Sequence, residues 1–110
     1  MSDALVENAA VLKRMSDDGD DLRRARGIEF AHVFVEEGRA REFCNWALRN
    51  GYVASLEDRE DARIDVIVCN HMVPDLCTIT EFEKMLGEAA RDYEGESDGW
   101  GCITIPRRHS

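Results

Sequence analysis

Two short runs rich in β-branched and aromatic residues constrain the fold of this 110-residue chain more than any other feature. The first run covers residues 28–35 and the second covers residues 64–72. Each is followed by a helical pattern and then by a weaker strand pattern, which predicts two β-α-β units in series. Because the second run is almost continuously apolar, we expect these two strands to be the central pair of one sheet.

The first of these strands has one face that is bulkier than the other, and we expect the bulkier face to point into the core. That face carries Ile28, Phe30, His32 and Phe34, whereas the opposite face carries Glu29, Ala31, Val33 and Val35. The opposite face is then either uncovered or covered by the N-terminal helix.

One helical pattern precedes the strands, and two others lie between strands. An apolar stripe at Leu5, Ala9, Leu12 and Met15 predicts an N-terminal helix. A second helix is predicted over residues 36–50, with Gly51 after its end. Thr78 and Glu81 form a capping box that predicts the start of a third helix, which runs to residue 93. The weaker strands are predicted at 52–56 and 100–105.

This order of elements predicts an α+β fold, the ferredoxin-like βαββαβ sandwich with an additional N-terminal helix. The length predicts a single domain over residues 1–110. Within it we expect an N-terminal helix in 1–18, a ferredoxin-like core in 27–105 and a tail in 106–110, of which residues 107–110 are expected to be disordered.

The segment from Tyr93 to Gly101 predicts a structural corner near the C-terminus. Gly95 is expected to take the left-handed conformation that ends a helix, and Asp98-Gly99 to form a tight turn into the last strand. Trp100 is expected to be mostly buried against the last helix near Tyr93. Gly101 leaves room for a large ring or a neighbouring backbone.

The net charge of −9 favours a partner with a basic protein segment over nucleic acid or an anionic membrane. The acids are clustered, and one cluster at Glu57, Asp58, Glu60 and Asp61 marks an exposed turn. Acidic clusters often form solvated loops that keep a protein soluble, and this alternative stays open. The candidate partner-binding residues are Asp17, Asp18, Asp20, Asp21, Glu94, Glu96 and Asp98.

No motif for catalysis, metal binding or cofactor binding is present in the sequence. The nearest set of metal-ligating residues is His32, Cys69, His71 and Cys102, which lacks the usual short ligand spacing. Cys69 and His71 are two residues apart on one strand, which separates them by about 7 Å, too far for direct proton transfer. We therefore expect no catalytic, metal or cofactor residue, and reduced cysteines in a cytoplasmic protein without a membrane segment.

Several motifs taken together resemble the family of regulators of ribonuclease E activity, type B. They are Asp18-Gly19-Asp20-Asp21-Leu22, Ile28-Glu29-Phe30-Ala31-His32-Val33-Phe34, Gly51-Tyr52-Val53, Val66-Ile67-Val68, Met72-Val73-Pro74, and Gly95 with Asp98-Gly99-Trp100-Gly101. The resemblance implies a ferredoxin-like fold without catalytic activity. It also implies binding to the non-catalytic region of ribonuclease E and an effect on RNA decay.

We therefore expect a non-enzymatic, acidic, protein-binding regulator of this kind. The alternative is a ferredoxin-like regulatory domain that senses a small molecule. The sequence leaves the oligomeric state open.

Overall fold

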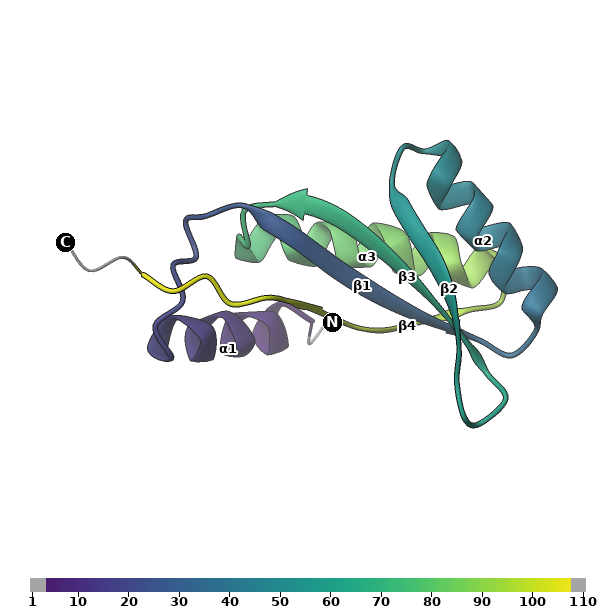
Figure 1. Cartoon of the computed structure of the whole chain (residues 1–110), viewed down its shortest axis with the longest axis horizontal. Coiled ribbons are helices and arrows are strands. Elements are labelled where there is room, and N and C mark those ends of the chain that lie inside the picture. The colour runs from purple at the N-terminus through teal and green to yellow at the C-terminus, as the bar shows by residue number, and fades with distance from the viewer. Residues whose placement is uncertain (1–3, 108–110) are drawn as a thin grey trace.

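The computed structural model describes residues 4–107, which form three helices and four strands (Figure 1). Residues 1–3 of the expected N-terminal helix and residues 108–110 of the expected tail lie outside the described part of the chain. The elements in order are α1 (Ala4–Asp17), β1 (Arg26–Phe34), α2 (Glu37–Arg49), β2 (Val53–Asp58), β3 (Ile64–Met72), α3 (Leu76–Asp92) and β4 (Glu96–Cys102).

The strands form one antiparallel sheet in the order β2-β3-β1-β4. The prediction that β1 and β3 form the central pair is confirmed. Their pairing is the longest in the sheet and runs without a break from Arg26 opposite Met72 to Phe34 opposite Ile64. The α+β class is therefore confirmed.

The core lies between one face of the sheet and the helices α2 and α3. As predicted, Ile28, Phe30, His32 and Phe34 point into it, each no more than 1% exposed. The ring of Phe30 lies 5.0 Å from that of Phe82 on α3, and the ring of His32 lies 5.0 Å from that of Phe43 on α2. Both helices therefore cover the same face of the sheet.

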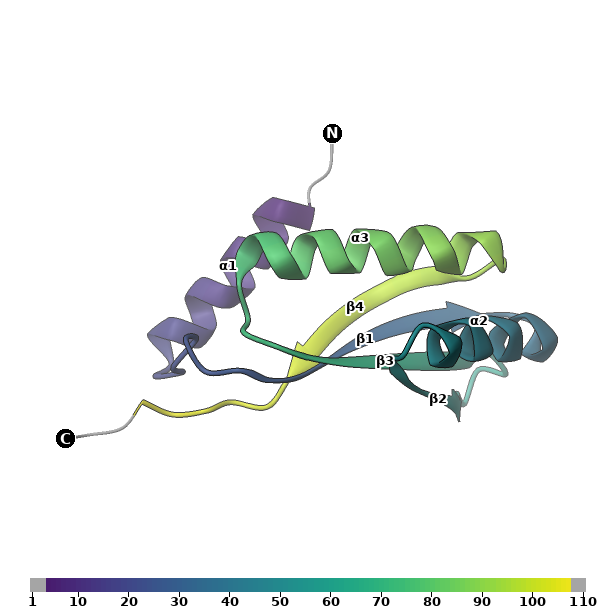
Figure 2. The same ribbon diagram turned by 90° about the horizontal axis from the view of Figure 1, so that it is seen from above.

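The helix α1 packs beside α3 rather than on the opposite face of the sheet. Figure 2 shows α1 crossing near the start of α3, with α3 running alongside β4. None of the helices described in residues 4–107 packs on the second sheet face, which we call the outer face. Alternation along each strand places Glu29, Ala31 and Val33 there, in agreement with the predicted division of β1.

The predicted start of the last helix at Thr78 is wrong, because α3 begins at Leu76 with Asp75 as its N-cap residue. The Asp75 backbone is extended, and its carboxylate accepts hydrogen bonds from the Thr78 N–H and from the Thr78 hydroxyl, each at 3.0 Å. A carboxylate at this position satisfies amide groups that the first helical turn leaves unpaired. The Thr78 side chain therefore supports the cap instead of forming it.

The predicted tight turn at Asp98-Gly99 is also wrong, because both residues lie inside β4. Phe30 pairs with Trp100 while His32 pairs with Ser97, so two residues of β4 oppose one residue of β1. This is a β-bulge, and Gly99 adopts the positive φ of 96° that such a position favours in glycine. The strand starts at Glu96 and ends at Cys102, earlier at both ends than predicted.

Glu94, and not Gly95, takes the left-handed conformation after α3, with φ of 67°. The Glu94 N–H donates to Arg91 O at 3.0 Å and the Gly95 N–H donates to Ala90 O at 2.8 Å. This pair of bonds is the Schellman arrangement that satisfies the last carbonyls of a helix. The predicted role of Gly95 is therefore corrected.

The segment after β4 is held by the loop that follows α1, so the predicted disorder is wrong for Arg107. The Asp21 N–H donates to Ile105 O at 2.7 Å, and Pro106 forms a bridge with Asp20. The Arg107 N–H donates to Gly19 O at 3.0 Å.

Among the described helices, none is both long enough and apolar enough to cross a membrane.

Candidate functional site

Trp100 joins β4 to α1 through Asn8. Its indole Nε1–H donates to Asn8 Oδ1 at 2.8 Å, and Asn8 Nδ2 donates to Thr80 Oγ1 at 3.1 Å and to Glu83 Oε1 at 3.2 Å on α3. Trp100 is half-buried, and Asn8 is 4% exposed. The expected neighbour Tyr93 instead contacts Phe43, with ring centroids 6.2 Å apart.

Asn8 was missed in the sequence, although a signal was present. It lies three residues after Leu5 and four before Leu12, within the apolar stripe of α1. A polar residue in such a stripe must be exposed or hydrogen-bonded, and here it is hydrogen-bonded.

Asp20 is not part of the acidic surface, because its carboxylate is buried. It is 1% exposed, and its Oδ2 accepts from Arg26 Nη1 at 2.8 Å. Arg26, 2% exposed, also donates to the Ile103 and Asp21 carbonyl oxygens at 2.9 and 2.8 Å. The other Asp20 oxygen has no partner within residues 4–107. Arg26 enters β1 two residues before Ile28 and so faces the core side, which the sequence indicated but the prediction overlooked.

The other acids of the first cluster remain near the surface. Asp17 and Asp18 are exposed at the end of α1, where Asp17 pairs with Lys13 at 2.9 Å. Asp21 is half-buried, and the hydrogen bond from the Arg23 side chain lowers the pKa of this carboxyl. These three carboxylates therefore share one end of the molecule.

The acids of the C-terminal cluster are exposed but two of them have partners. Glu94 pairs with Arg39 at 3.3 Å, and Asp98 pairs with Arg59 at 3.2 Å. Glu96 is exposed at the start of β4. Figure 1 places the loop after α1 and the start of β4 at opposite ends of the long axis, so the two clusters do not form one surface.

The four residues considered as a metal set are not brought together. The register places Cys69 and His71 on the outer face and His32 and Cys102 on the core side. Burial lowers the pKa of His32 to about 4, so this side chain is neutral at pH 7. Its Nδ1 lies 3.4 Å from Val66 O. No cluster of potential metal ligands occurs within residues 4–107.

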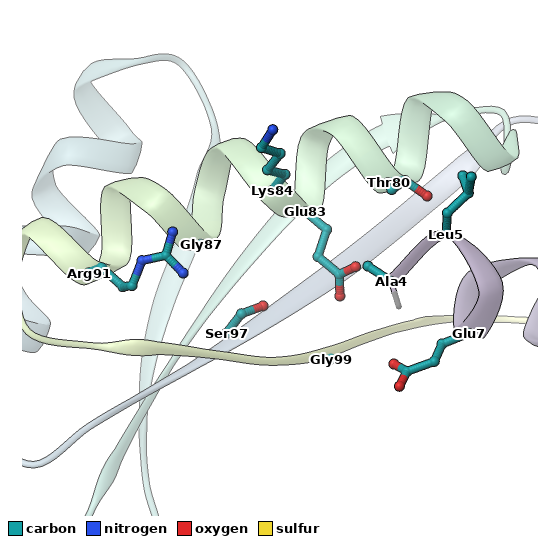
Figure 3. Close-up of a pocket in the computed structure, with 10 residues that line it drawn as sticks. All are labelled: Ala4, Leu5, Glu7, Thr80, Glu83, Lys84, Gly87, Arg91, Ser97 and Gly99. Atoms are coloured by element: carbon teal, nitrogen blue, oxygen red, sulfur yellow. The ribbon is translucent and has the colours of Figure 1, made fainter. Parts of the chain in front are cut away.

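A groove of about 650 Å³ lies between α1, α3 and β4. Figure 3 shows Arg91 on the α3 side, with Ser97 and Gly99 on β4 opposite, while the Lys84 side chain extends from α3 away from β4. Glu83, which accepts from Asn8, borders the groove toward α1. The groove therefore combines cationic and acidic side chains over a floor of small residues.

The outer face carries a second groove of about 460 Å³ at the end near Cys102.

Arg59, from the turn after β2, reaches over the outer face near the end opposite this groove. Its Nη1 donates to Asp65 on β3 at 3.1 Å and to Asp98 on β4 at 3.2 Å. Arg59 therefore bridges strands on both sides of β1, which the sequence did not indicate.

Together these features define a small α+β protein with a formal net charge of −9 and one sheet face left uncovered by the described helices. The family model described as regulator of ribonuclease activity B matches residues 6–102. The chain belongs to this family. Membership implies regulation of ribonuclease activity, interaction with a ribonuclease and a non-enzymatic role. No individual curated protein sequence matches the chain.

Proposed function

We propose that this protein binds the non-catalytic region of ribonuclease E in the cytoplasm and thereby modulates RNA decay, without catalytic activity of its own. Family membership supports a ribonuclease as the partner. The observation that carries the finer proposal is the net charge of −9, with exposed carboxylates at Asp17, Asp18 and Glu96. Such a field attracts a basic protein segment and repels RNA and anionic membranes.

We propose further that the fold is the ferredoxin-like sandwich and that residues 1–110 act as one domain. Two split β-α-β units support this assignment. β3 lies between β1 and β2, which α2 connects, and β1 lies between β3 and β4, which α3 connects.

The decisive test measures binding to the catalytic and non-catalytic halves of ribonuclease E, purified separately. We expect the non-catalytic half alone to bind, with an affinity that falls as NaCl rises from about 0.1 M to 1 M, because the screening length shortens from about 10 Å to 3 Å. Binding to neither half, or to the catalytic half alone, contradicts the proposal.

The role of the first acidic cluster is tested by reversing Asp17 and Asp18 to Lys. Both residues are exposed near the C-terminal end of α1, where cations suit the helix dipole, so the fold is retained. The matched control reverses Glu81 and Glu88, exposed acids on α3, and changes the net charge equally. We expect slower association only with the first pair. Equal effects of both pairs assign the attraction to total charge instead of this cluster.

A second candidate function, the sensing of a small molecule, is favoured by the groove between α1, α3 and β4 (Figure 3). Its volume of about 650 Å³ lies within the usual range for ligand sites. A thermal-shift screen of metabolites separates the two functions. A sensor is stabilised by a specific ligand at saturating concentration, whereas a protein-binding regulator shows no such shift.

A further inference from the structure

The outer face combines apolar side chains in its middle with carboxylates around them. The register aligns Ala31 and Val33 of β1 with Ile67 and Asp65 of β3, and Val53 of β2 with Cys69 of β3. Val53 is 70% exposed. These side chains form an apolar strip, interrupted by the Asp65 carboxylate, that the described helices leave uncovered. Uncovered apolar surface of this kind favours an interaction site.

The groove at one end of this face has the shape to receive an apolar side chain. Six residues line it: Gly27, Glu29, Cys69, Gly101, Cys102 and Ile103. A side chain added at Gly101 would meet no atom within 4 Å, because the space above this residue is open. Ile103, 72% exposed, forms an apolar wall. The groove is therefore shallow and largely apolar, with Glu29 at its margin.

The charges on this face select a cationic partner. Within residues 4–107, Glu29, Glu57 and Glu96 are exposed and have no ion-pair partner. The arginine that reaches over the face, Arg59, is already bonded to Asp65 and Asp98. The field above the strip is consequently negative, and it favours arginine or lysine beside an apolar anchor.

We propose that the outer face docks a cationic segment of the ribonuclease, which places a small apolar side chain in the groove and pairs its basic residues with Glu29, Glu57 and Glu96. This inference rests on the proposed function, since it assigns the surface by which that partner is bound. It also moves the principal contact from the loops at the two ends of the molecule to the sheet between them.

The same charges argue against two other occupants. RNA would place phosphates against exposed carboxylates. A second copy of the chain, docked by a twofold axis, would set the same patch against itself and bring like charges together. The measurements described below would nevertheless detect either RNA or a second copy of the chain on this face.

The first arm of the test uses a fluorescent ten-residue peptide of alternating arginine and valine, with a glutamate–valine peptide as its charge-reversed control. We expect only the arginine–valine peptide to bind the wild-type protein. Gly101→Val fills the groove without a clash at its Cβ, and it should weaken binding at least about tenfold. Gly38→Val, whose Cβ also lies in open space but on α2, should leave binding unchanged.

A second variant keeps the test valid if Gly101→Val does not fold. Val53→Lys replaces a 70% exposed side chain on an edge strand, where lysine is well tolerated. It removes apolar area and adds a like charge against the peptide, so affinity should again fall at least about tenfold. Unchanged peptide affinity in a folded Gly101→Val or Val53→Lys protein overturns the inference, as does the absence of peptide binding to wild type.

The second arm measures the same variants against the non-catalytic half of ribonuclease E. If wild type binds the peptide but neither half of the enzyme, the proposed function fails while the peptide-docking face stands. If the non-catalytic half binds wild type and both variants equally, the proposed function stands and this surface assignment is overturned.

Two final measurements address the other occupants. Displacement of the peptide by single-stranded RNA would assign the face to nucleic acid and overturn the inference. Sedimentation equilibrium showing a dimer that Gly101→Val dissociates would make the face a self-interface, with the same consequence.

Discussion

Gly95 is required by the ring of Phe34 and not by the backbone turn in which it lies. A Cβ built on Gly95 would lie 2.3 Å from two atoms of this ring, well inside van der Waals contact. Both residues are buried, Phe34 being 1% exposed, so the ring has little space into which it can retreat. The left-handed position is taken instead by Glu94, a residue that tolerates it less well than glycine.

Gly95→Ala should therefore destabilise the protein by about 1–3 kcal/mol, because a methyl group must be forced into a packed core. The matched control is Gly101→Ala, whose added Cβ meets nothing within 4 Å. Urea unfolding of both variants gives the comparison. Equal stability of the two variants would show that Phe34 moves freely and that packing does not select this glycine.

His32 makes the stability of the fold depend on pH. Its pKa falls from 6.5 to about 4 on folding because the ring is buried. The unfolded chain therefore binds more protons between these values, and stability is lost as pH falls from about 6.5 to 4. The full effect corresponds to about 3 kcal/mol by the usual conversion of 1.36 kcal/mol per pKa unit.

His32→Phe should flatten this part of the stability profile, measured by urea unfolding between pH 4 and 7.5. The exposed His71→Gln variant should retain the wild-type slope. Acidic side chains also change the free energy of unfolding at the lower end of this pH range. The quantity to compare is therefore the difference in slope between the His32→Phe and His71→Gln profiles. A His32→Phe profile parallel to that of wild type contradicts the buried, neutral imidazole.

At the scale of elements, the start of α3 depends on a carboxylate before the helix and not on a hydroxyl within it. Asp75→Ala should cost about 0.5–2 kcal/mol, because the Thr78 N–H loses its partner. Thr78→Ala should cost less, since that N–H still donates to Asp75. Thermal unfolding of the two variants ranks them. A larger loss of stability with Thr78→Ala than with Asp75→Ala would identify Thr78 as the N-cap residue, as predicted from the sequence.

The attachment of α1 depends on the hydrogen bond between Trp100 and Asn8. Trp100→Phe keeps an aromatic ring but removes the indole donor, and Asn8→Ala removes the acceptor. Each should cost about 1–3 kcal/mol, because Trp100→Phe leaves the buried Asn8 oxygen, and Asn8→Ala the half-buried indole N–H, without its partner. The double variant should cost less than the two single losses combined, which a double-mutant cycle measures. Strict additivity would mean that the two side chains stabilise the fold independently.

At the scale of the whole molecule, the Asp20–Arg26 pair joins the end of α1, the start of β1 and the segment after β4. Asp20→Ala should cost about 3–5 kcal/mol, because Arg26 is then buried without a counter-charge. Adding Arg26→Met should recover much of this loss, since it removes the unpaired charge. Asp18→Ala, an exposed neighbour, should change stability by no more than about 0.5 kcal/mol. Denaturant unfolding that finds Asp20→Ala as mild as this control would contradict the buried pair.

The sequence alone was enough to determine the type and order of the elements, the central strand pair and the buried face of β1. These follow from alternation and from runs of β-branched residues, which are local properties of the chain. The family resemblance was also available, because its motifs are short and lie in a fixed order along the chain.

Tertiary contacts decided the rest. Asp20 and Asp18 have the same local composition, yet only Asp20 meets an arginine from β1 and becomes buried. Asp98-Gly99 has the chemistry of a turn, but pairing with β1 holds it in a strand as a bulge. Gly95 matches a helix-ending glycine, but the ring of Phe34 determines its place. The partners of Gly95 and of Asp98-Gly99 are distant in sequence, and Arg26, although only six residues from Asp20, reaches it through the path that the chain takes into β1. No local pattern therefore reveals which of two permitted conformations each contact stabilises.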